Sequence, residues 1–401
     1  MKKKKLVILG GGTAGNIFSH RLSKQIATND WDIILIDKSI VHYYQPGFLF
    51  IPFGVYNPED VVKNKDEVLN RNVQTIYSDI QSILPTENNV LLSNGEKIEY
   101  DYLIIATGVN IAPEEVEGMK GDLWGTDVFD FYTYDGAVGL SQALKKFNKG
   151  NLVVHITEMP IKCPVAPLEF AFLSDWFFRK NGLRKDVIIH FVTPLPEAFT
   201  KPDAARVFSD FLSQKGIALH TDFNIAAVDN QKKEIVSWDN RTIPFDTLVT
   251  VPTNMGAEAI GNSGIGDELN LVPTNPQTLL ARDFENIFVA GDASDIPTSK
   301  AGSVIHFQTD VIEKNLIAKI NGRPMNAVFD GHANCFIETG DEKAILIDFD
   351  YNRDPAEGRY PIHGLGPLSL LKETRLNHFG KMAFKWLYWN RIIKGKEIPF
   401  T

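Results

Sequence analysis

Two cysteines, Cys163 and Cys335, are the residues of this chain best suited to redox chemistry. Two cysteines in 401 residues cannot form a structural disulfide framework. In a reducing compartment a pair that bridges is usually catalytic or redox-sensing. Such a disulfide is an electrophile that a thiolate can open, and exchange is fast when the leaving thiol has a low pKa. The alternative is that they are two unrelated small hydrophobic residues, since 172 positions separate them.

The segment around Cys163 adds a possible proton-transfer group. It reads Cys163-Pro-Val-Ala-Pro-Leu-Glu169 and precedes a predicted helix from Pro167 to Arg179. A helix N-terminus near Cys163 is expected to lower the pKa of its thiol. A carboxyl at Glu169 beside an apolar pocket would have the raised pKa that suits proton transfer, although it could also be a solvated residue of the first helical turn.

The elements that must position these groups begin with a nucleotide-binding unit. A predicted buried strand, Lys4 to Leu9, is followed by Gly10-Gly-Gly-Thr-Ala-Gly15 and by a predicted helix from Thr13 to Gln25. This G-x-G-x-x-G loop allows a pyrophosphate to approach the backbone at the helix N-terminus. A second strand, Trp31 to Ile36, ends in Asp37, where a carboxylate should meet the ribose hydroxyls of an adenine dinucleotide. The motif does not choose between NAD and FAD, and a glycine turn of another α/β protein is the alternative.

The ends of two later predicted strands indicate which dinucleotide is bound. The strand from Asp101 runs into Ala106-Thr107-Gly108, and the strand from Asn286 runs into Gly291-Asp292. These residues resemble the signatures of the two-dinucleotide-domain flavoproteins related to glutathione reductase. The resemblance implies that FAD is the cofactor and that Asp292 reaches its ribityl chain.

A second glycine-rich loop, which relatives that use NAD(P)H carry, is missing. The strand that should open the second domain, Asn151 to Ile156, is followed by Thr157-Glu-Met-Pro160. A side chain and a proline thus stand where a second pyrophosphate would approach the backbone. We expect the second domain to keep its α/β shape without a nicotinamide site, which counts against an NADH:quinone dehydrogenase.

The cysteine segment, Cys-Pro-x-Ala-Pro-x-Glu, resembles sulfide:quinone oxidoreductases and the flavin subunit of flavocytochrome c sulfide dehydrogenase. The similarity runs from about residue 4 to the C-terminus, with support from Tyr43-Tyr44-Gln45-Pro46-Gly47 and from Lys300. The resemblance implies that hydrosulfide opens a Cys163–Cys335 disulfide and that electrons pass to FAD and then to quinone. It also implies that sulfur leaves as polysulfide or sulfur and that Glu169 transfers protons. The cofactor-binding residues expected from the motifs and the resemblance are Gly10, Gly12, Thr13, Ala14, Gly15, Asp37, Lys38, Tyr44, Pro46, Ala106, Thr107, Gly108, Gly291, Asp292, Lys300 and Gly302.

The chain departs from many quinone-reducing relatives in having no third cysteine between about Asp122 and Asp135. Covalent attachment of flavin through a cysteine there is excluded, and a soluble sulfur acceptor becomes conceivable. Two alternatives stay open: a sulfide dehydrogenase subunit that donates electrons to a cytochrome, and a sulfur-carrier protein with little turnover.

The C-terminal segment from Lys372 to Lys396 combines seven basic residues and one acid with several large apolar side chains. This combination is typical of an interfacial anchor on an anionic membrane, and Pro361 to Leu371 could dip into lipid as well. The alternative is a basic helix that packs on its own domain. The resemblance implies monotopic attachment, with quinone bound by Lys381 and Phe384. Phe336, beside Cys335, is expected to line the same pocket. The apolar residues expected at the membrane are Phe379, Met382, Phe384, Trp386, Trp389, Ile392 and Ile393.

Composition limits the remaining possibilities. A net charge of −9 argues against nucleic-acid binding. No apolar run approaches a membrane span, and the run after Lys2–Lys5 is too short for a signal peptide, so we expect a peripheral or monotopic protein on the cytoplasmic side of the cell membrane. We expect no metal site and a homo-oligomer. The fold class is α/β, with an FAD domain (1–113 and 270–320), a second Rossmann-like domain carrying Cys163 (114–269) and a C-terminal lobe with Cys335 and the membrane helices (321–401).

Overall fold

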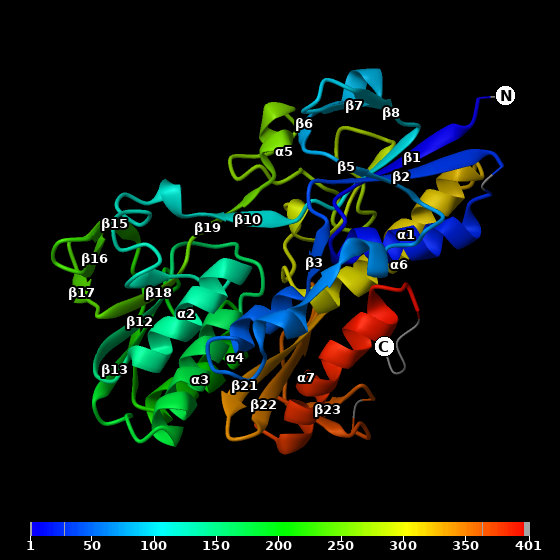
Figure 1. The fold of residues 1–401 in the computed structure, drawn as a ribbon. Helices are drawn as coiled ribbons and strands as arrows, with labels where there is room; N and C mark the ends of the chain where they lie inside the picture. The colour runs from blue at the N-terminus through cyan, green and yellow to red at the C-terminus, as the bar shows by residue number, and fades with distance from the viewer. Residues whose placement is uncertain (1, 28, 363, 397–401) are drawn as a thin grey trace.

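The computed structural model describes residues 2–27, 29–362 and 364–396. The described chain forms three lobes, each built around its own sheet (Figure 1). The first and second lobes contain parallel sheets flanked by helices, and the third contains a smaller sheet close to the C-terminus. The α/β class expected from the sequence is confirmed.

The first lobe is a parallel sheet in the order β20-β9-β1-β2-β5. Its central strands are continuous apolar runs because both faces are covered. On one face lie α1 (Thr13–Gln25) and α6 (Gly302–Ile320), and on the other lies a three-stranded sheet (Figure 1). The strands of the parallel sheet are β1 (Lys4–Leu9), β2 (Trp31–Asp37), β5 (Gln74–Tyr77), β9 (Tyr102–Ile105) and β20 (Ile287–Val289); the covering strands are β6 (Ile80–Leu84), β7 (Asn89–Leu92) and β8 (Lys97–Glu99).

The second lobe repeats this arrangement in the order β11-β18-β12-β13-β14. Helices cover one face, and the small sheet β15-β16-β17 covers the other. Its elements are β11 (Val128–Phe129), α2 (Tyr134–Lys146), β12 (Gly150–Ile156), α3 (Ala166–Lys180), β13 (Val187–Val192), α4 (Pro202–Gln214), β14 (Ile217–His220), β15 (Ile225–Asp229), β16 (Glu234–Ser237), β17 (Thr242–Pro244) and β18 (Thr247–Val251). The predicted helix after Cys163 is therefore present as α3.

Short elements join and flank the two lobes. The antiparallel pair β10 (Val109–Ala112) and β19 (Thr253–Gly256) carries the chain out of the first lobe and back. The others are β3 (Val41–Tyr43), β4 (Val62–Asn64) and α5 (Glu258–Asn262), and the 3-10 turns η1 (Gln45–Phe50), η2 (Pro58–Val61), η3 (Lys65–Glu67), η4 (Pro85–Glu87), η5 (Pro113–Glu115) and η6 (Gly291–Ala293).

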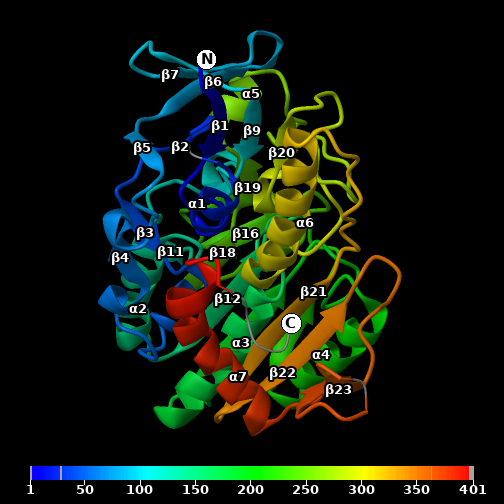
Figure 2. The same cartoon turned by 90° about the vertical axis from the view of Figure 1, so that its right-hand side faces the viewer.

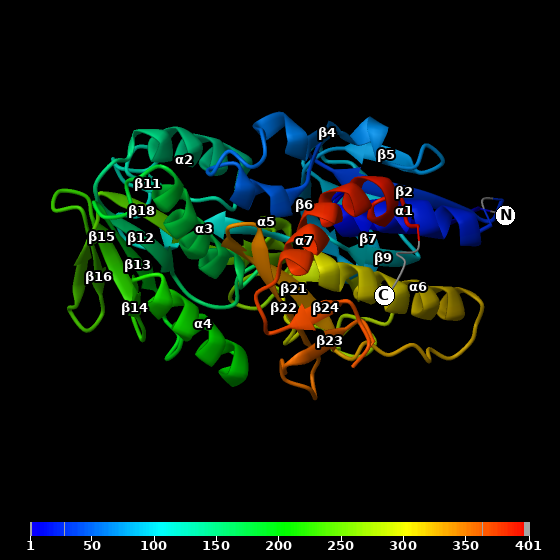
Figure 3. The same ribbon diagram turned by 90° about the horizontal axis from the view of Figure 1, so that it is seen from below.

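The third lobe is a four-stranded sheet in the order β21-β22-β24-β23 that packs between α3 and α7 (Figure 2). Helix α7 begins after Thr374, whose hydroxyl caps it, and continues into a π-helix. Seen from below, α7 lies across the junction of the first and third lobes (Figure 3). The elements are β21 (Ala333–Gly340), β22 (Lys343–Phe349), β23 (Gly358–Tyr360), β24 (Leu368–Leu370), α7 (Arg375–Leu387) and η7 (Tyr388–Ile392).

Candidate active site

The loop between β1 and α1 is shaped to receive a dinucleotide. Gly10 has a φ of +97°, and a Cβ there would lie 2.4 Å from the carbonyl oxygen of Ala106. A Cβ on Gly15 would lie 1.9 Å from the carbonyl oxygen of Gly10, so neither position tolerates a side chain. A Cβ on Gly12 would meet nothing within 4 Å. The helix N-terminus therefore faces open space, as a bound pyrophosphate requires.

Asp37 lies at the end of β2, close to this loop. Its carboxylate accepts hydrogen bonds from the backbone N–H of Gly11 and, at 2.7 Å, from that of Ser39. The ammonium of Lys65 binds the same carboxylate at 2.6 Å, although Lys65 is only 3% exposed. This lysine was not predicted. These contacts fix the carboxyl of Asp37 at the place where ribose hydroxyls are expected.

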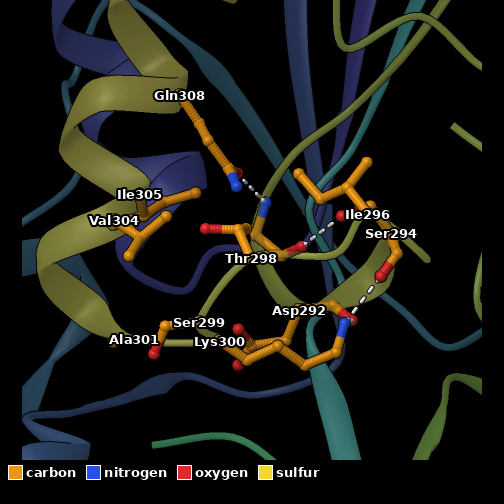
Figure 4. A pocket seen from close by; sticks show the side chains of 11 residues that line it. Asp292, Ser294, Ile296, Thr298, Ser299, Lys300, Ala301, Val304, Ile305 and Gln308 are labelled. Atoms are coloured by element: carbon orange, nitrogen blue, oxygen red, sulfur yellow. Dashed lines mark hydrogen bonds between the residues drawn. The ribbon is translucent and has the colours of Figure 1, made fainter. Parts of the chain in front are cut away.

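The loop that follows β20 carries the other predicted cofactor residues (Figure 4). Gly291 donates its N–H to the side chain of Gln308 at 2.7 Å. Lys300 is buried, and its ammonium binds the carbonyl oxygens of Asp292 and Ser294 at 2.8 and 2.6 Å. Burial raises the pKa of Asp292, and Lys300 opposes this effect. Lys300 thus fixes the backbone of the loop. Among the described residues, the carboxyl of Asp292 has no hydrogen-bond partner.

Two further observations fit FAD. The hydroxyl of Thr107 is buried and has no hydrogen-bond partner among the described residues, and such groups are rare without a ligand. Gly108 has a φ of +67° and open space in front of it. Ala106, Thr107 and Gly108 thus line the loop that faces Gly10. The donor and acceptor groups present match the phosphates, ribose and ribityl chain of a dinucleotide.

The remaining predicted cofactor residues lie in different surroundings. Pro46 and Gly302 come together: a Cβ on Gly302 would lie 3.9 Å from the Cγ of Pro46. Tyr44 is buried and packs its ring against Tyr388, with ring centroids 4.8 Å apart. Lys38 is exposed, and its ammonium faces a surface aspartate rather than the glycine loop.

The two cysteines approach each other from different lobes. Cys163 precedes α3, has a φ of +50°, and donates its N–H to the carbonyl of Lys300. Cys335 lies on β21, where the hydroxyl of Ser299, the residue before Lys300, is beside its thiol. A charge on Cys335 raises the pKa of Cys163, so each sulfur lies within the electrostatic field of the other. Both are free thiols in this structure.

The expected low pKa of Cys163 is wrong for this state of the protein. Burial, followed by the charges of Cys335 and Glu169, raises the pKa of Cys163 far above its ordinary value. Burial also raises the pKa of Cys335 to about 11, while Lys381 opposes the shift. The N-terminus of α3 does not compensate, because desolvation of a thiolate outweighs a terminal helix dipole.

Glu169 lies on the first turn of α3 and is fully buried, so the solvated alternative is excluded. Its carboxylate accepts the backbone N–H of Glu338 at 2.9 Å and binds the ammonium of Lys381 at 2.9 and 3.2 Å. Burial raises its pKa, and Lys381 opposes the rise. Lys381 also donates to the carbonyl of Phe336 at 2.9 Å. One predicted proton-transfer residue and two predicted quinone residues therefore meet beside Cys335.

The aromatic residues around Lys381 form one side of this site. A Cβ on Gly380 would lie 2.8 Å from the Phe336 ring, so that ring rests directly on α7. The ammonium of Lys381 lies 5.8 Å from the centroid of Phe50. Phe384, one turn further, is half-buried and faces Tyr44 with ring centroids 6.4 Å apart. Flat aromatic faces beside an ammonium could hold a planar ring that accepts hydrogen bonds.

The C-terminal helix is only partly available to a membrane. Trp389, Ile392 and Ile393 are buried against the first lobe, so the expectation that they face lipid is wrong. Phe379 and Trp386, in contrast, are 62% and 61% exposed. The three buried side chains pack on the apolar surface of the first lobe, because this removes their apolar area from water. No described helix has the length and apolarity to cross a bilayer.

A buried network that the sequence did not indicate ties this helix to the glycine loop. The hydroxyl of Tyr388 hydrogen-bonds the hydroxyl of Thr13 at 2.8 Å and the Nε2 of His42 at 2.8 Å. His42 Nδ1 lies 3.1 Å from the amide nitrogen of Asn16. Burial lowers the pKa of His42 to about 4, so the ring is neutral at pH 7. Of these residues the sequence marked only Thr13, because the contacts of Tyr388, His42 and Asn16 depend on the packing of segments that are distant in the chain.

Comparison with known proteins gives a consistent result. Residues 4–158 match the family described as pyridine nucleotide-disulphide oxidoreductase. The chain is 28% identical to the mitochondrial sulfide:quinone oxidoreductase of Dictyostelium discoideum, over 98% of this chain and 86% of that protein. It is 24% identical to the sulfide-quinone reductase of Aquifex aeolicus, over 99% and 93% respectively.

The fold agrees with a solved structure. The crystal structure of the sulfide:quinone oxidoreductase from Aquifex aeolicus matches with a TM-score of 0.80 at 22% identity, covering 98% of this chain and 92% of that one. This likeness shows the fold, and the nearly full-length matches to curated proteins agree with the glycine loop and the two cysteines. Over nearly its whole length the chain is similar to sulfide:quinone oxidoreductases, a family of FAD-binding flavoproteins.

Proposed function

We propose that this protein oxidises sulfide at the pair Cys163 and Cys335 and passes the electrons through FAD to a quinone. The observation that carries the proposal is the meeting of three segments at one place. Cys163 from the second lobe, Ser299 and Lys300 from the first, and Cys335 from the third lie side by side. Glu169, Lys381 and Phe336 adjoin this cluster.

The cysteines supply the sulfur chemistry. In the oxidised protein, hydrosulfide attacks one sulfur of the Cys163–Cys335 disulfide, leaving a persulfide on one cysteine and a thiolate on the other. The ammonium of Lys381 stabilises this thiolate, since its charge lowers the pKa of both thiols. Bound FAD would supply the two-electron acceptor for this centre and the electron donor for quinone. Further sulfide lengthens the sulfur chain until polysulfide or sulfur leaves.

Other residues bind and orient the cofactor. The loop Gly10 to Gly15 would hold the pyrophosphate, Asp37 the ribose, and Asp292 the ribityl chain. Thr107 offers a buried hydroxyl with no protein partner among the described residues. Lys38 is unsuited to this role because it points to the surface.

Quinone binding is assigned to Phe336, Lys381 and Phe384. The ammonium can donate to a quinone oxygen, and the two aromatic rings can contact the faces of the quinone ring. Exposed Phe379 and Trp386, together with the basic residues of the same helix, suit a peripheral attachment through which quinone enters from the bilayer. Attachment on the cytoplasmic side and a homo-oligomeric state stay predictions.

An anaerobic titration tests the proposal. Sulfide is added to the purified FAD-loaded protein while the flavin absorbance is recorded, and a short-chain quinone follows. We expect bleaching by sulfide, recovery with quinone, and no bleaching in Cys163→Ser. Bleaching by NADH but not by sulfide would refute the cysteine chemistry. Bleaching that quinone does not reverse would indicate a protein electron acceptor.

A further inference from the structure

Quinone reduction creates a demand for protons that the proposed function leaves unassigned. The overall reaction is hydrosulfide plus quinone plus one proton giving one sulfur atom, added to polysulfide, and quinol. Two electrons leave the sulfur, and two O–H bonds form on the quinone. A quinone that enters from a bilayer has hydrocarbon on one side, so at least one proton must come from water through the protein.

A buried histidine–carboxylate pair adjoins the Lys381 site. The Oε2 of Glu338 on β21 lies 2.9 Å from Nδ1 of His378 on the first turn of α7. The other carboxylate oxygen, Oε1, is buried and has no hydrogen-bond partner among the described residues. A buried carboxylate oxygen left unpaired is costly, so it is expected where a proton or a ligand visits.

Contacts lead inward from this pair. The backbone N–H of Glu338 donates to Glu169, and Glu169 binds Lys381. The charges of Glu338 and Lys381 also interact with each other. Side-chain exposure falls from 19% at His378 to 3% at Glu338 and 0% at Glu169. The pair thus lies between the protein surface and Lys381, within the electrostatic field of its ammonium.

The surroundings of Glu338 suit it to gain and lose a proton near neutral pH. Burial raises its pKa to about 7, although His378 and Lys381 oppose the rise. The charged and titratable groups that face it are His378 and Lys381 from α7, Glu169 from α3, and Tyr56 from the segment after η1. An acid whose pKa lies near the working pH transfers protons most effectively.

We propose that His378 and Glu338 relay protons from water to Lys381 during quinone reduction, an inference that rests on the proposed function. Lys381 gives a proton to a quinone oxygen and regains one from the Glu338 carboxyl. Glu338 then takes a proton from the Nδ1 of His378, and the Nε2 of His378 takes one from water. Each step breaks one N–H or O–H bond and forms another, and the electrons reach the quinone separately.

The two half-reactions separate this relay from the sulfur chemistry. Sulfide-driven bleaching and quinone-driven recovery of the flavin are timed by anaerobic stopped flow from pH 6 to 9. In Glu338→Gln we expect the recovery rate to fall at least tenfold, with bleaching within twofold of the unmodified protein. In His378→Ala we expect a similar loss, which imidazole added to the solution reverses.

A matched control lies in the same lobe. His332 and Asp348 form a pair of like geometry, 2.8 Å apart, that does not contact Lys381. His332→Gln should leave both half-reactions unchanged. If Glu338→Gln does not bind FAD, Glu338→Asp serves instead and should keep a recovery rate that falls as pH rises.

The outcomes distinguish the two proposals. Recovery rates of Glu338→Gln and His378→Ala within twofold of the unmodified protein would overturn the relay and leave the proposed function intact. Equal slowing of bleaching and recovery would show a structural role and also overturn the relay. If sulfide does not bleach the unmodified protein, the proposed function itself is wrong, and the relay falls with it.

Discussion

Replacing Lys381 by methionine would leave Glu169 buried without its cation. Glu169 is fully buried, and Lys381 is the main group that opposes the rise of its pKa. The variant can avoid a buried charge by protonating Glu169. The loss in the free energy of unfolding therefore cannot exceed the cost of this protonation. From the ordinary pKa of 4.5, protonation at pH 7 costs ~3.4 kcal/mol, since each pH unit corresponds to ~1.36 kcal/mol. This agrees with ~3–5 kcal/mol for breaking a buried ion pair.

The sign of the pH dependence follows from the same group. In the variant the folded pKa of Glu169 lies above its unfolded value, so the penalty is absent below pH 4.5 and grows as pH rises. We therefore expect Lys381→Met to lower the free energy of unfolding by at most ~3.4 kcal/mol at pH 7 and by less than ~1 kcal/mol at pH 5. The double variant Lys381→Met/Glu169→Gln should recover most of the loss at pH 7, because it contains no buried charge.

Urea unfolding of the FAD-loaded protein, followed by tryptophan fluorescence at both pH values, measures this difference. Lys385→Met is the matched control, since Lys385 lies one turn further on α7 and pairs with the half-exposed Asp60 at 3.4 Å. A surface pair of this kind contributes ~0–1 kcal/mol. An equal penalty for Lys381→Met at pH 5 and pH 7, or a double variant no more stable than the single one, would refute the reasoning.

Three further predictions concern separate parts of the molecule. Because burial raises the pKa of Cys335 to about 11, the alkylation rate of Cys335 in the reduced protein should rise ~10-fold per pH unit between pH 7 and 9. Mass spectrometry measures this rate, and a plateau near neutral pH would contradict the prediction. Trp386→Glu should weaken binding to anionic vesicles in a flotation assay, whereas Trp238→Glu, an exposed tryptophan of the second lobe, should not; equal binding by both would refute the assigned membrane face. Tyr388→Phe removes two buried hydrogen bonds of ~1 kcal/mol each and should speed FAD release on dilution, followed by the recovery of flavin fluorescence; an unchanged rate would show that His42 and Thr13 hold the loop without it.

The sequence predicted those parts of the site that are local in the chain. The strand, glycine loop and helix from Lys4 to Gln25 agree with the structure residue for residue, because short-range sterics and hydrophobic pattern decide them. Glu169 was singled out by its place six residues after Cys163, and its burial follows from α3 packing under β21. The positive φ of Cys163 gave no signal in the sequence.

What could not be predicted depends on contacts between lobes. No sequence pattern distinguishes Lys65 or Tyr388 from other lysines and tyrosines. Only the fold places them beside Asp37 and Thr13, respectively. The pKa of Cys163 was misjudged because helix position can be read locally, whereas desolvation depends on what covers the thiol. The prediction for the C-terminal helix was partly correct for a similar reason. The helix is amphipathic, but part of its apolar face packs against the rest of the protein.

The meeting of the cysteines has a consequence for the synthesis of the chain. Cys163 can be translated and folded within the second lobe long before Cys335 exists, and Lys381 follows later still. During that time the exposed chain contains a solitary thiol without a partner or a neighbouring cation. The reactive centre therefore forms only when the third lobe closes on α3, so partly synthesised molecules cannot perform sulfur chemistry.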